Sequence, residues 1–80
     1  MAVTLNGLAN VYRDAGRLTE AEPLYRRALS IRQDALPAGN PYIAETLEDY
    51  AELLRLMGRD DEAASMAQRA AAGRAPSVKD

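Results

Sequence analysis

Residues 2–32 read AVTLNGLANVYRDAGRLTEAEPLYRRALSIR, and residues 44–74 read AETLEDYAELLRLMGRDDEAASMAQRAAAGR. When one stretch is laid on the other with a shift of 42 positions, 12 of the 31 paired residues are identical. Self-similarity at a fixed period is typical of repeat architectures, in which each repeat is one supersecondary unit. Alanine and leucine matches fall at helical spacing, and a glycine (position 16 or 58) separates two periodic runs. The sequence therefore predicts two copies of a helix-turn-helix unit.

The first unit is predicted to begin with a helix that ends at Gly16, because the left-handed conformation at a helix end costs glycine little. Its apolar stripe recurs at steps of three and four residues and consists of Leu5, Leu8, Ala9 and Tyr12. A capping box of Thr19 and Glu22 is expected to start the second helix, with Pro23 in its first turn. This helix is predicted to run to about residue 35 or 36.

The second unit follows a loop that reads LPAGNP over residues 36–41. Asn40 is expected to cap the third helix, and Pro41 suits the first helical position because its φ is already fixed. The third helix is predicted to end at Gly58. Asp60 or Asp61 is expected to cap the fourth helix and Gly73 to close it, which leaves a frayed, flexible tail from about residue 75 to residue 80.

The composition limits the possible chemistry. The chain has 80 residues, of which 48% are hydrophobic and 28% charged, as expected for one folded domain. It contains no Cys and no His, which excludes disulfides, zinc fingers and Ser-His-Asp triads, and we expect neither a metal nor a cofactor. The net charge of −2 argues against a nucleic-acid partner. No apolar run is long enough to cross a membrane, and the first six residues do not resemble a signal peptide, so a cytoplasmic location is expected.

Catalysis has little support in the sequence. Asp60, Asp61 and Glu62 could act as acid and base or bind a hard cation, but acidic residues at a helix start are explained by capping and by the helix dipole. No glycine-rich phosphate loop or nucleophile elbow is present. We therefore predict that the protein is not an enzyme and has no catalytic residues.

A family resemblance can now be stated. The run LNGLANVY (residues 5–12), followed by Gly16 and by AEPLYRRAL (residues 21–29), resembles the tetratricopeptide repeat (TPR). The 42-residue spacing and the linker at residues 37–41 resemble its kinesin-light-chain variant. The resemblance implies an all-α fold, an α-solenoid fragment of two TPR units with four antiparallel helices. The repeat domain would span residues 1–74, with unit one at 2–36, a loop at 37–40 and unit two at 41–73. The second copy departs from the pattern at Ala67, where the aromatic residue of the second helix is missing.

The resemblance also implies a function. TPR arrays are non-catalytic protein-interaction modules that hold a peptide or a partner segment in a concave groove lined by the first helix of each unit. Asn6 and Asn10 lie four residues apart and point the same way, and an amide can donate to and accept from a peptide backbone. The alternative is that both are merely solvated. The residues that would line the groove are Asn6, Asn10, Arg13, Glu45, Glu48, Asp49, Glu52 and Arg55, with Val3, Asp14 and Leu56 beside them.

The charges of this surface suggest the kind of ligand. Glu45, Glu48, Asp49 and Glu52 form one acidic stripe, and like charges at this spacing repel, so we predict a preference for basic peptides. Arg13 and Arg55 could hold a carboxylate or phosphate, although pairing with the nearby Asp14 or Glu52 is favoured. The arginines of the second helix are interpreted as surface charge, namely Arg26, Arg27 and Arg32.

An alternative function is structural. About three repeats are usually needed for independent stability, because neighbouring units cover each other's apolar stripes. Here there are two, and the exposed side of the first unit is expected to be apolar, which favours association. The chain would then be the end of a longer TPR array, packed against neighbouring repeats, or a homo-oligomer.

Overall fold

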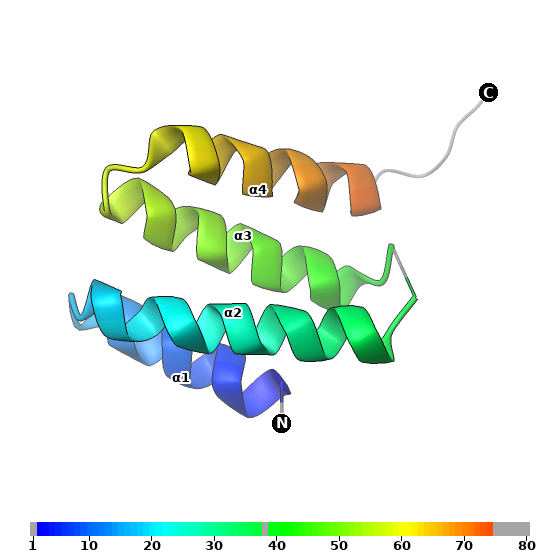
Figure 1. Ribbon diagram of the computed structural model, residues 1–80, viewed down its shortest axis with the longest axis horizontal. Coiled ribbons are helices and arrows are strands. Elements are labelled where there is room, and N and C mark those ends of the chain that lie inside the picture. Colours follow the sequence, from blue (N-terminus) through cyan, green and yellow to red (C-terminus); the bar gives the residue numbers. More distant parts are fainter. Residues whose placement is uncertain (1, 38, 75–80) are drawn as a thin grey trace.

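The computed structural model describes residues 2–37 and 39–74. They form four α-helices, α1 (Ala2–Asp14), α2 (Leu18–Ala35), α3 (Pro41–Leu56) and α4 (Asp60–Arg74), and this part of the chain contains no strand (Figure 1). The all-α fold predicted from the repeat is confirmed. The predicted tail at residues 75–80 lies outside the described residues.

The helices are stacked in chain order. α1 packs against α2, α2 against α3 and α3 against α4, so that α1 and α4 lie at opposite ends of the molecule (Figure 1). The molecule measures 43 × 28 × 15 Å, which is an elongated arrangement. Because α1 and α4 do not close on each other, the four helices form a stack of two hairpins rather than a closed bundle.

Both hairpin turns have the same geometry. Gly16 and Gly58 have φ angles of 80° and 78°, in the left-handed region that glycine adopts without steric cost. The next residue in each turn donates its N–H back to the helix: Arg17 to the Tyr12 carbonyl at 2.9 Å, and Arg59 to the Leu54 carbonyl at 2.8 Å. This is the Schellman type of helix end, and it confirms both glycine predictions.

The start of α3 is also as predicted. Asn40 has an extended backbone, and its Oδ1 accepts the backbone N–H of Tyr42 at 2.9 Å. Pro41 is the first helical residue, where the missing N–H leaves no hydrogen bond unmade.

The start of α2 corrects the predicted capping box. The helix begins at Leu18, its N-cap residue is Arg17, and no side chain caps it. Thr19 therefore lies inside the first turn, and Pro23 lies two residues further along the helix than expected, in its second turn. The reason is tertiary: the Glu22 carboxylate accepts hydrogen bonds from Tyr50 of α3 and from Arg59 of the α3–α4 turn instead of turning back to its own N-terminus.

Two expectations about α4 are also revised. The helix begins at Asp60, so Asp60 and Asp61 lie within its first turn, where the helix dipole favours their charge. Gly73 does not close the helix, which continues to Arg74. A glycine inside a helix costs only about 1 kcal/mol, which is not enough to end it by itself.

The main core cluster contains residues from all four helices, with most of them on α2 and α3. Its largest side chains are Tyr25 and Tyr50, whose rings stack across the α2–α3 contact with centroids 5.8 Å apart and planes 13° from parallel. Small residues allow the helices to approach closely around them. The buried members of this cluster are Ala9, Ala21, Tyr25, Tyr50, Ala51, Leu53, Leu54 and Ala63.

Candidate functional site

The eight predicted groove residues lie on α1 and α3, and together they are called the polar face below. α1 supplies Asn6, Asn10 and Arg13. α3 supplies Glu45, Glu48, Asp49, Glu52 and Arg55. No enclosed pocket is found in the described part of the chain, so this face is an open surface.

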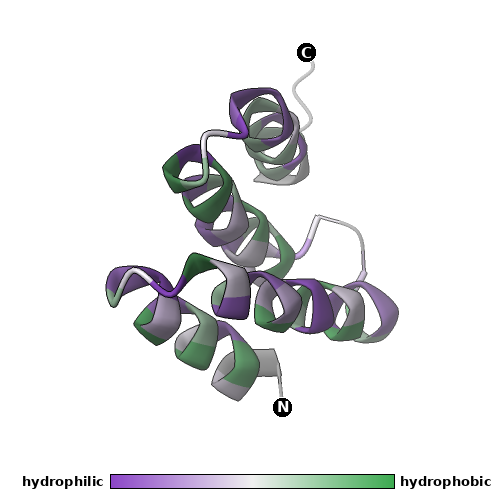
Figure 2. Ribbon diagram, turned by 60° about the vertical axis from the view of Figure 1, so that its left-hand side comes forward, coloured by the Kyte–Doolittle hydropathy of each residue, from purple (hydrophilic) through white to green (hydrophobic). Residues whose placement is uncertain are grey.

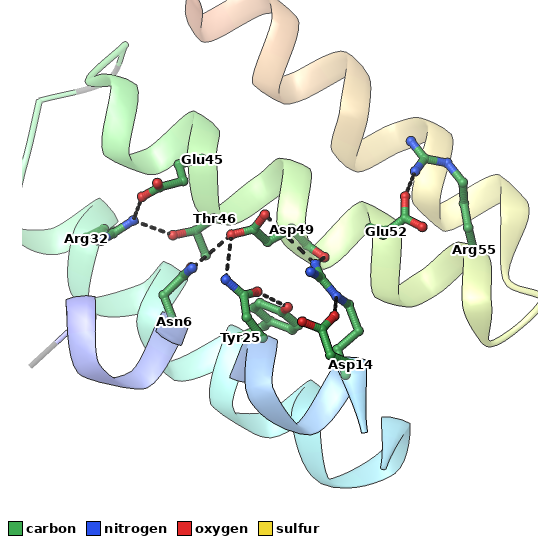
Figure 3. A network of polar contacts seen from close by, with 11 residues as sticks. Asn6, Asp14, Tyr25, Arg32, Glu45, Thr46, Asp49, Glu52 and Arg55 are labelled. Atoms are coloured by element: carbon green, nitrogen blue, oxygen red, sulfur yellow. Dashed lines mark hydrogen bonds and ion pairs between the residues drawn. The ribbon is translucent and has the colours of Figure 1, made fainter. Parts of the chain in front are cut away.

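Asp49 joins the two helices at the centre of the polar face. Its Oδ2 accepts a hydrogen bond from Asn6 Nδ2 at 2.9 Å and another from Asn10 Nδ2 at 3.4 Å (Figure 3). Arg13 Nη1 donates to the Asp49 backbone carbonyl at 3.4 Å and lies 3.9 Å from Oδ1. The structure therefore brings together four of the residues that the sequence placed on one surface.

Asn6 carries an unsatisfied acceptor. Only 5% of the residue is exposed, and its Oδ1 is buried without a hydrogen-bond partner. The bond from Nδ2 to Asp49 fixes which side of the amide carries the oxygen, because a carboxylate can only accept. A buried acceptor without a partner costs about 1–3 kcal/mol, so a donor that gains access to this oxygen would recover part of that cost.

Asn10 differs from Asn6 because both sides of its amide are engaged. Its Oδ1 accepts a hydrogen bond from the Tyr25 hydroxyl, and its Nδ2 reaches Asp49. Burial raises the pKa of Tyr25 to about 12, so the hydroxyl remains protonated and remains a donor at neutral pH. Tyr25 thereby connects the core to the polar face.

Glu45 pairs with Arg32, which is buried and not on the solvated side of α2. Arg32 was expected on the solvated side of α2, but it is only 4% exposed. Its Nη1 donates to Glu45 Oε1 at 3.0 Å, to the Tyr42 carbonyl at 2.8 Å and to Thr46 Oγ1 at 2.8 Å. One signal could have revealed this role: Arg32 and its partner Thr46 are both identical to their counterparts in the other repeat.

The remaining charges of the polar face are also paired. Arg55 Nη1 lies 2.5 Å from Glu52 Oε1, and Arg13 Nε lies 3.3 Å from Asp14 Oδ1. Both arginines therefore make the structural pairings favoured by the sequence. The repulsion expected along the acidic stripe is reduced within the protein itself, because Glu45 and Glu52 each have an arginine partner and Asp49 accepts from two amides.

A second polar cluster lies at the α2–α3 contact and was not anticipated. Glu22 Oε2 accepts from the Tyr50 hydroxyl at 2.8 Å, from Arg59 Nη1 at 2.8 Å and from Arg26 Nη2 at 3.1 Å. Burial raises the pKa of Glu22, but the hydrogen bonds from Tyr50 and Arg59 outweigh it and hold this pKa below its ordinary value of 4.5. The cluster fastens the two hairpins together and lies apart from the polar face.

The stacked hairpins define a helical repeat protein, and comparison with known proteins identifies the repeat. A family model described as tetratricopeptide repeat matches residues 1–75, so the chain belongs to the tetratricopeptide repeat family. Proteins of this family generally serve as non-catalytic scaffolds that bind other proteins. The kinesin-light-chain subtype stays a prediction. No curated protein matches the chain. Within the described residues, no helix is long and apolar enough to span a membrane.

Proposed function

We propose that the polar face binds a peptide segment of a partner protein. The observation that carries this proposal is the buried Oδ1 atom of Asn6, which has no hydrogen-bond partner. Backbone N–H groups are the donors that every peptide presents in a row. A peptide laid along α1 and α3 would place one of them on this oxygen after a small shift of the surrounding side chains that uncovers it.

The local geometry supports such an interaction. Asp49 holds the Asn6 amide in one orientation, so its acceptor is already positioned before a ligand arrives. Preorganised groups lose little conformational entropy on binding, which raises affinity. The absence of an enclosed pocket in the described part of the chain suits an elongated ligand better than a small molecule.

The test is a selection from a displayed library of short peptides, followed by affinity measurements on the selected sequences. We expect Asn6→Ala to weaken binding by roughly tenfold, the loss of one buried hydrogen bond. Arg27→Ala is the matched control, because Arg27 is exposed on α2 and is not part of the polar face. Selected peptides that bind the Asn6→Ala variant as tightly as the original chain would exclude the polar face as their site.

The proposed ligand is basic. The polar face contains four carboxylates, Glu45, Glu48, Asp49 and Glu52, against two guanidiniums. Internal pairing lowers the repulsion among them, but it leaves the excess of negative charge in place. A lysine or arginine of the ligand would meet a favourable potential at this surface.

The charge preference predicts a specific mutational response. Replacing Glu48 and Glu52 together by Lys should weaken binding of a basic peptide by about tenfold or more at low salt, and raised salt should reduce this difference. Asp60→Lys and Asp61→Lys together change the net charge equally on α4 and serve as the control. Equal losses in the two double variants would mean that net charge, not the polar face, governs affinity.

A structural role is the second candidate, and a different observation favours it. Two apolar side chains at the open end of the stack are exposed, Leu8 by 41% and Val11 by 61%. Adjacent exposed apolar side chains favour association with another protein surface. Sedimentation of the chain with and without Leu8→Asp tests this role. The lack of catalytic activity and the cytoplasmic location stay predictions.

A further inference from the structure

The internal repeat allows α1 to be compared with α3 position by position. A shift of 42 residues places the first hairpin on the second, so each helix has the same neighbour within its own hairpin. Any difference in burial between paired positions therefore shows what the other hairpin covers. Leu8 is 41% exposed, but its counterpart Tyr50 is 4% exposed. Val11 is 61% exposed, but its counterpart Leu53 is fully buried.

These positions belong to one continuous stripe. Thr4, Leu8, Val11 and Ala15 follow one another at steps of four, three and four residues, and all four are exposed. We call them the outer stripe of α1. Their counterparts on α3 are covered: Thr46, Tyr50 and Leu53 are buried and Met57 is partly buried. Figure 2 shows hydrophobic residues along α1, the outermost helix at this end of the stack.

Arg17, which lies beside this stripe, also differs from its counterpart Arg59 in its hydrogen bonds. Arg59 binds Glu62 through Nε and Nη2, and its Nη1 donates to Glu22 of the neighbouring hairpin. Arg17, its counterpart, binds Glu20 in the same way through Nε and Nη2. No equivalent of Glu22 is present for Arg17 Nη1 among the described residues, and 56% of the Arg17 side chain is exposed.

The helix that covers α3 shows what fits such a surface. α2 presents Glu22 to Arg59 and Tyr50, the Tyr25 ring to the Tyr50 ring, and Arg32 to the hydroxyl of Thr46. Leu29 joins the same face and packs with Leu47. The outer stripe of α1 offers Leu8 and Thr4 at the corresponding places, and Arg17 lies just beyond the stripe in the following turn.

We propose that the outer stripe of α1 docks an amphipathic helix of a protein partner. The residues of this helix follow the pattern that α2 presents to α3. The helix has a glutamate that meets Arg17, an aromatic residue three positions later against Leu8, a leucine seven positions after the glutamate, and an arginine ten positions after it that meets Thr4. The inference rests on the structural role proposed above and is independent of peptide binding by the polar face.

A second copy of this chain is a poor occupant. Its α2 is already packed against its own α3. The open helix at the other end is α4, which has Ala64, Ala67 and Ala71 where α2 has Glu22, Tyr25 and Leu29. A stack of α4 on α1 would therefore lack both the carboxylate and the large apolar side chains that the outer stripe matches.

The probe for this inference is a synthetic peptide with the sequence of residues 18–35, held helical by a lactam bridge between positions 30 and 34, which are exposed on α2. Its affinity for the full chain is measured by fluorescence anisotropy, with a Glu22→Ala peptide beside it. The chain is tested as Leu8→Asp, Arg17→Ala and, as a control on an exposed leucine off the stripe, Leu56→Asp. Circular dichroism confirms that each variant is folded.

We expect Leu8→Asp to reduce the affinity at least tenfold and Leu56→Asp to leave it unchanged. The Glu22→Ala peptide and the Arg17→Ala chain should each lose about fivefold, with little further loss when combined, because they remove the same ion pair. Binding that is insensitive to Leu8→Asp overturns the inference. Binding that needs Leu8 but ignores Glu22 overturns the proposed partner chemistry and leaves the structural role intact.

Sedimentation tests whether a second copy of the chain occupies the outer stripe. If the chain self-associates and Leu8→Asp abolishes this, the occupant is a second copy, so the inference fails while the structural role stands. If the chain stays monomeric and the peptide does not bind, both the inference and the structural role are wrong.

Discussion

At the scale of single residues, the placement of polar side chains is decided by partners far away in the sequence. Arg32 lies in a helix with polar neighbours and would suit a solvated surface equally well. It is buried because three acceptors on α3 converge on one of its nitrogens. A buried guanidinium is tolerated only when its donors are satisfied in this way.

Arg32→Met tests this role. The variant keeps the aliphatic stem but leaves the Tyr42 carbonyl and the Thr46 hydroxyl without their charged donor. We expect the free energy of unfolding to fall by about 2 kcal/mol, in the range of hydrogen bonds to charged groups. Urea denaturation measures the change. Arg27→Met, at an exposed position of the same helix, should change it by less than about 0.5 kcal/mol, and equal effects would contradict the structural role of Arg32.

Two glycines are predicted to respond in opposite directions to alanine. Gly58 has a φ of 78°, which strains an alanine, so Gly58→Ala should destabilise the protein by about 1 kcal/mol. Gly7 lies inside α1, and a methyl group there would meet nothing within 4 Å, so Gly7→Ala should stabilise it by up to about 1 kcal/mol. Thermal unfolding of both variants checks the two signs, and shifts in the same direction would contradict this account.

At the scale of helices, most helix ends are set by neighbouring residues in the sequence, whereas tertiary packing decides which face of each helix is buried. α3 begins where Asn40 and Pro41 dictate, because the cap needs only the next two residues. α2 begins without its predicted cap because Glu22 is engaged across the α2–α3 contact. The Glu22 side chain extends toward Tyr50 and Arg59, and because α2 begins at Leu18 it stands too far into the helix for the predicted capping box.

The contact at Glu22 predicts a dependence of stability on pH. Its pKa is lowered in the folded state, so the ionised carboxylate stabilises the fold above 4.5, and this stabilisation is lost as the pH falls through the lowered value. The stability difference between the original chain and Glu22→Gln should be largest at neutral pH and shrink on acidification. Urea unfolding from about pH 7 to about pH 3 measures it.

Glu20→Gln is the control for this pH series. The pKa of Glu20 is also lowered, by its hydrogen bond from Arg17, but the pair is exposed to solvent. Screening by water makes such a pair contribute little, so its variant should follow the original chain closely at every pH. A Glu22→Gln difference that stays constant with pH would mean that the charge of Glu22 does not matter.

At the scale of the whole molecule, the stacked arrangement packs the inner helices on more sides than the outer helices. α2 and α3 are packed between other helices, whereas α4 contacts α3 alone and α1 contacts α2 with only a small additional contact to α3. In repeat proteins stability is close to a sum of unit and interface contributions, so outer elements open more easily than inner ones. The same geometry leaves the outer stripe of α1 open.

Amide hydrogen exchange should reveal this inequality. We expect backbone amides of α2 and α3 to exchange most slowly and those of α1 and α4 to exchange faster, because local opening of an outer helix uncovers less packed surface than opening of an inner one. Exchange followed by mass spectrometry on peptic fragments measures the order. Uniform protection of the four helices would show that the stack opens only as one unit.

The candidate site was predictable in part. The spacing of Asn6 and Asn10 on one helix, and of the acidic residues on the other, placed them on two faces that the repeat makes adjacent. Helical periodicity is enough for this, because every unit repeats the same geometry. The hydrogen-bond partners were not predictable. That Asp49 orients Asn6 depends on the offset between α1 and α3, and that Tyr25 engages Asn10 depends on the packing of α2 on α1.

The sequence by itself determined the helices, both glycine turns and the cap at Asn40, because each depends on residues within one turn of the chain. Only the tertiary structure decided that Arg32 and Glu22 are engaged between the hairpins and that Leu8 is left exposed. A side chain on a helix surface has several partners of similar chemistry within reach. Which of them it meets is fixed only when whole helices pack and exclude water from one contact and not from another.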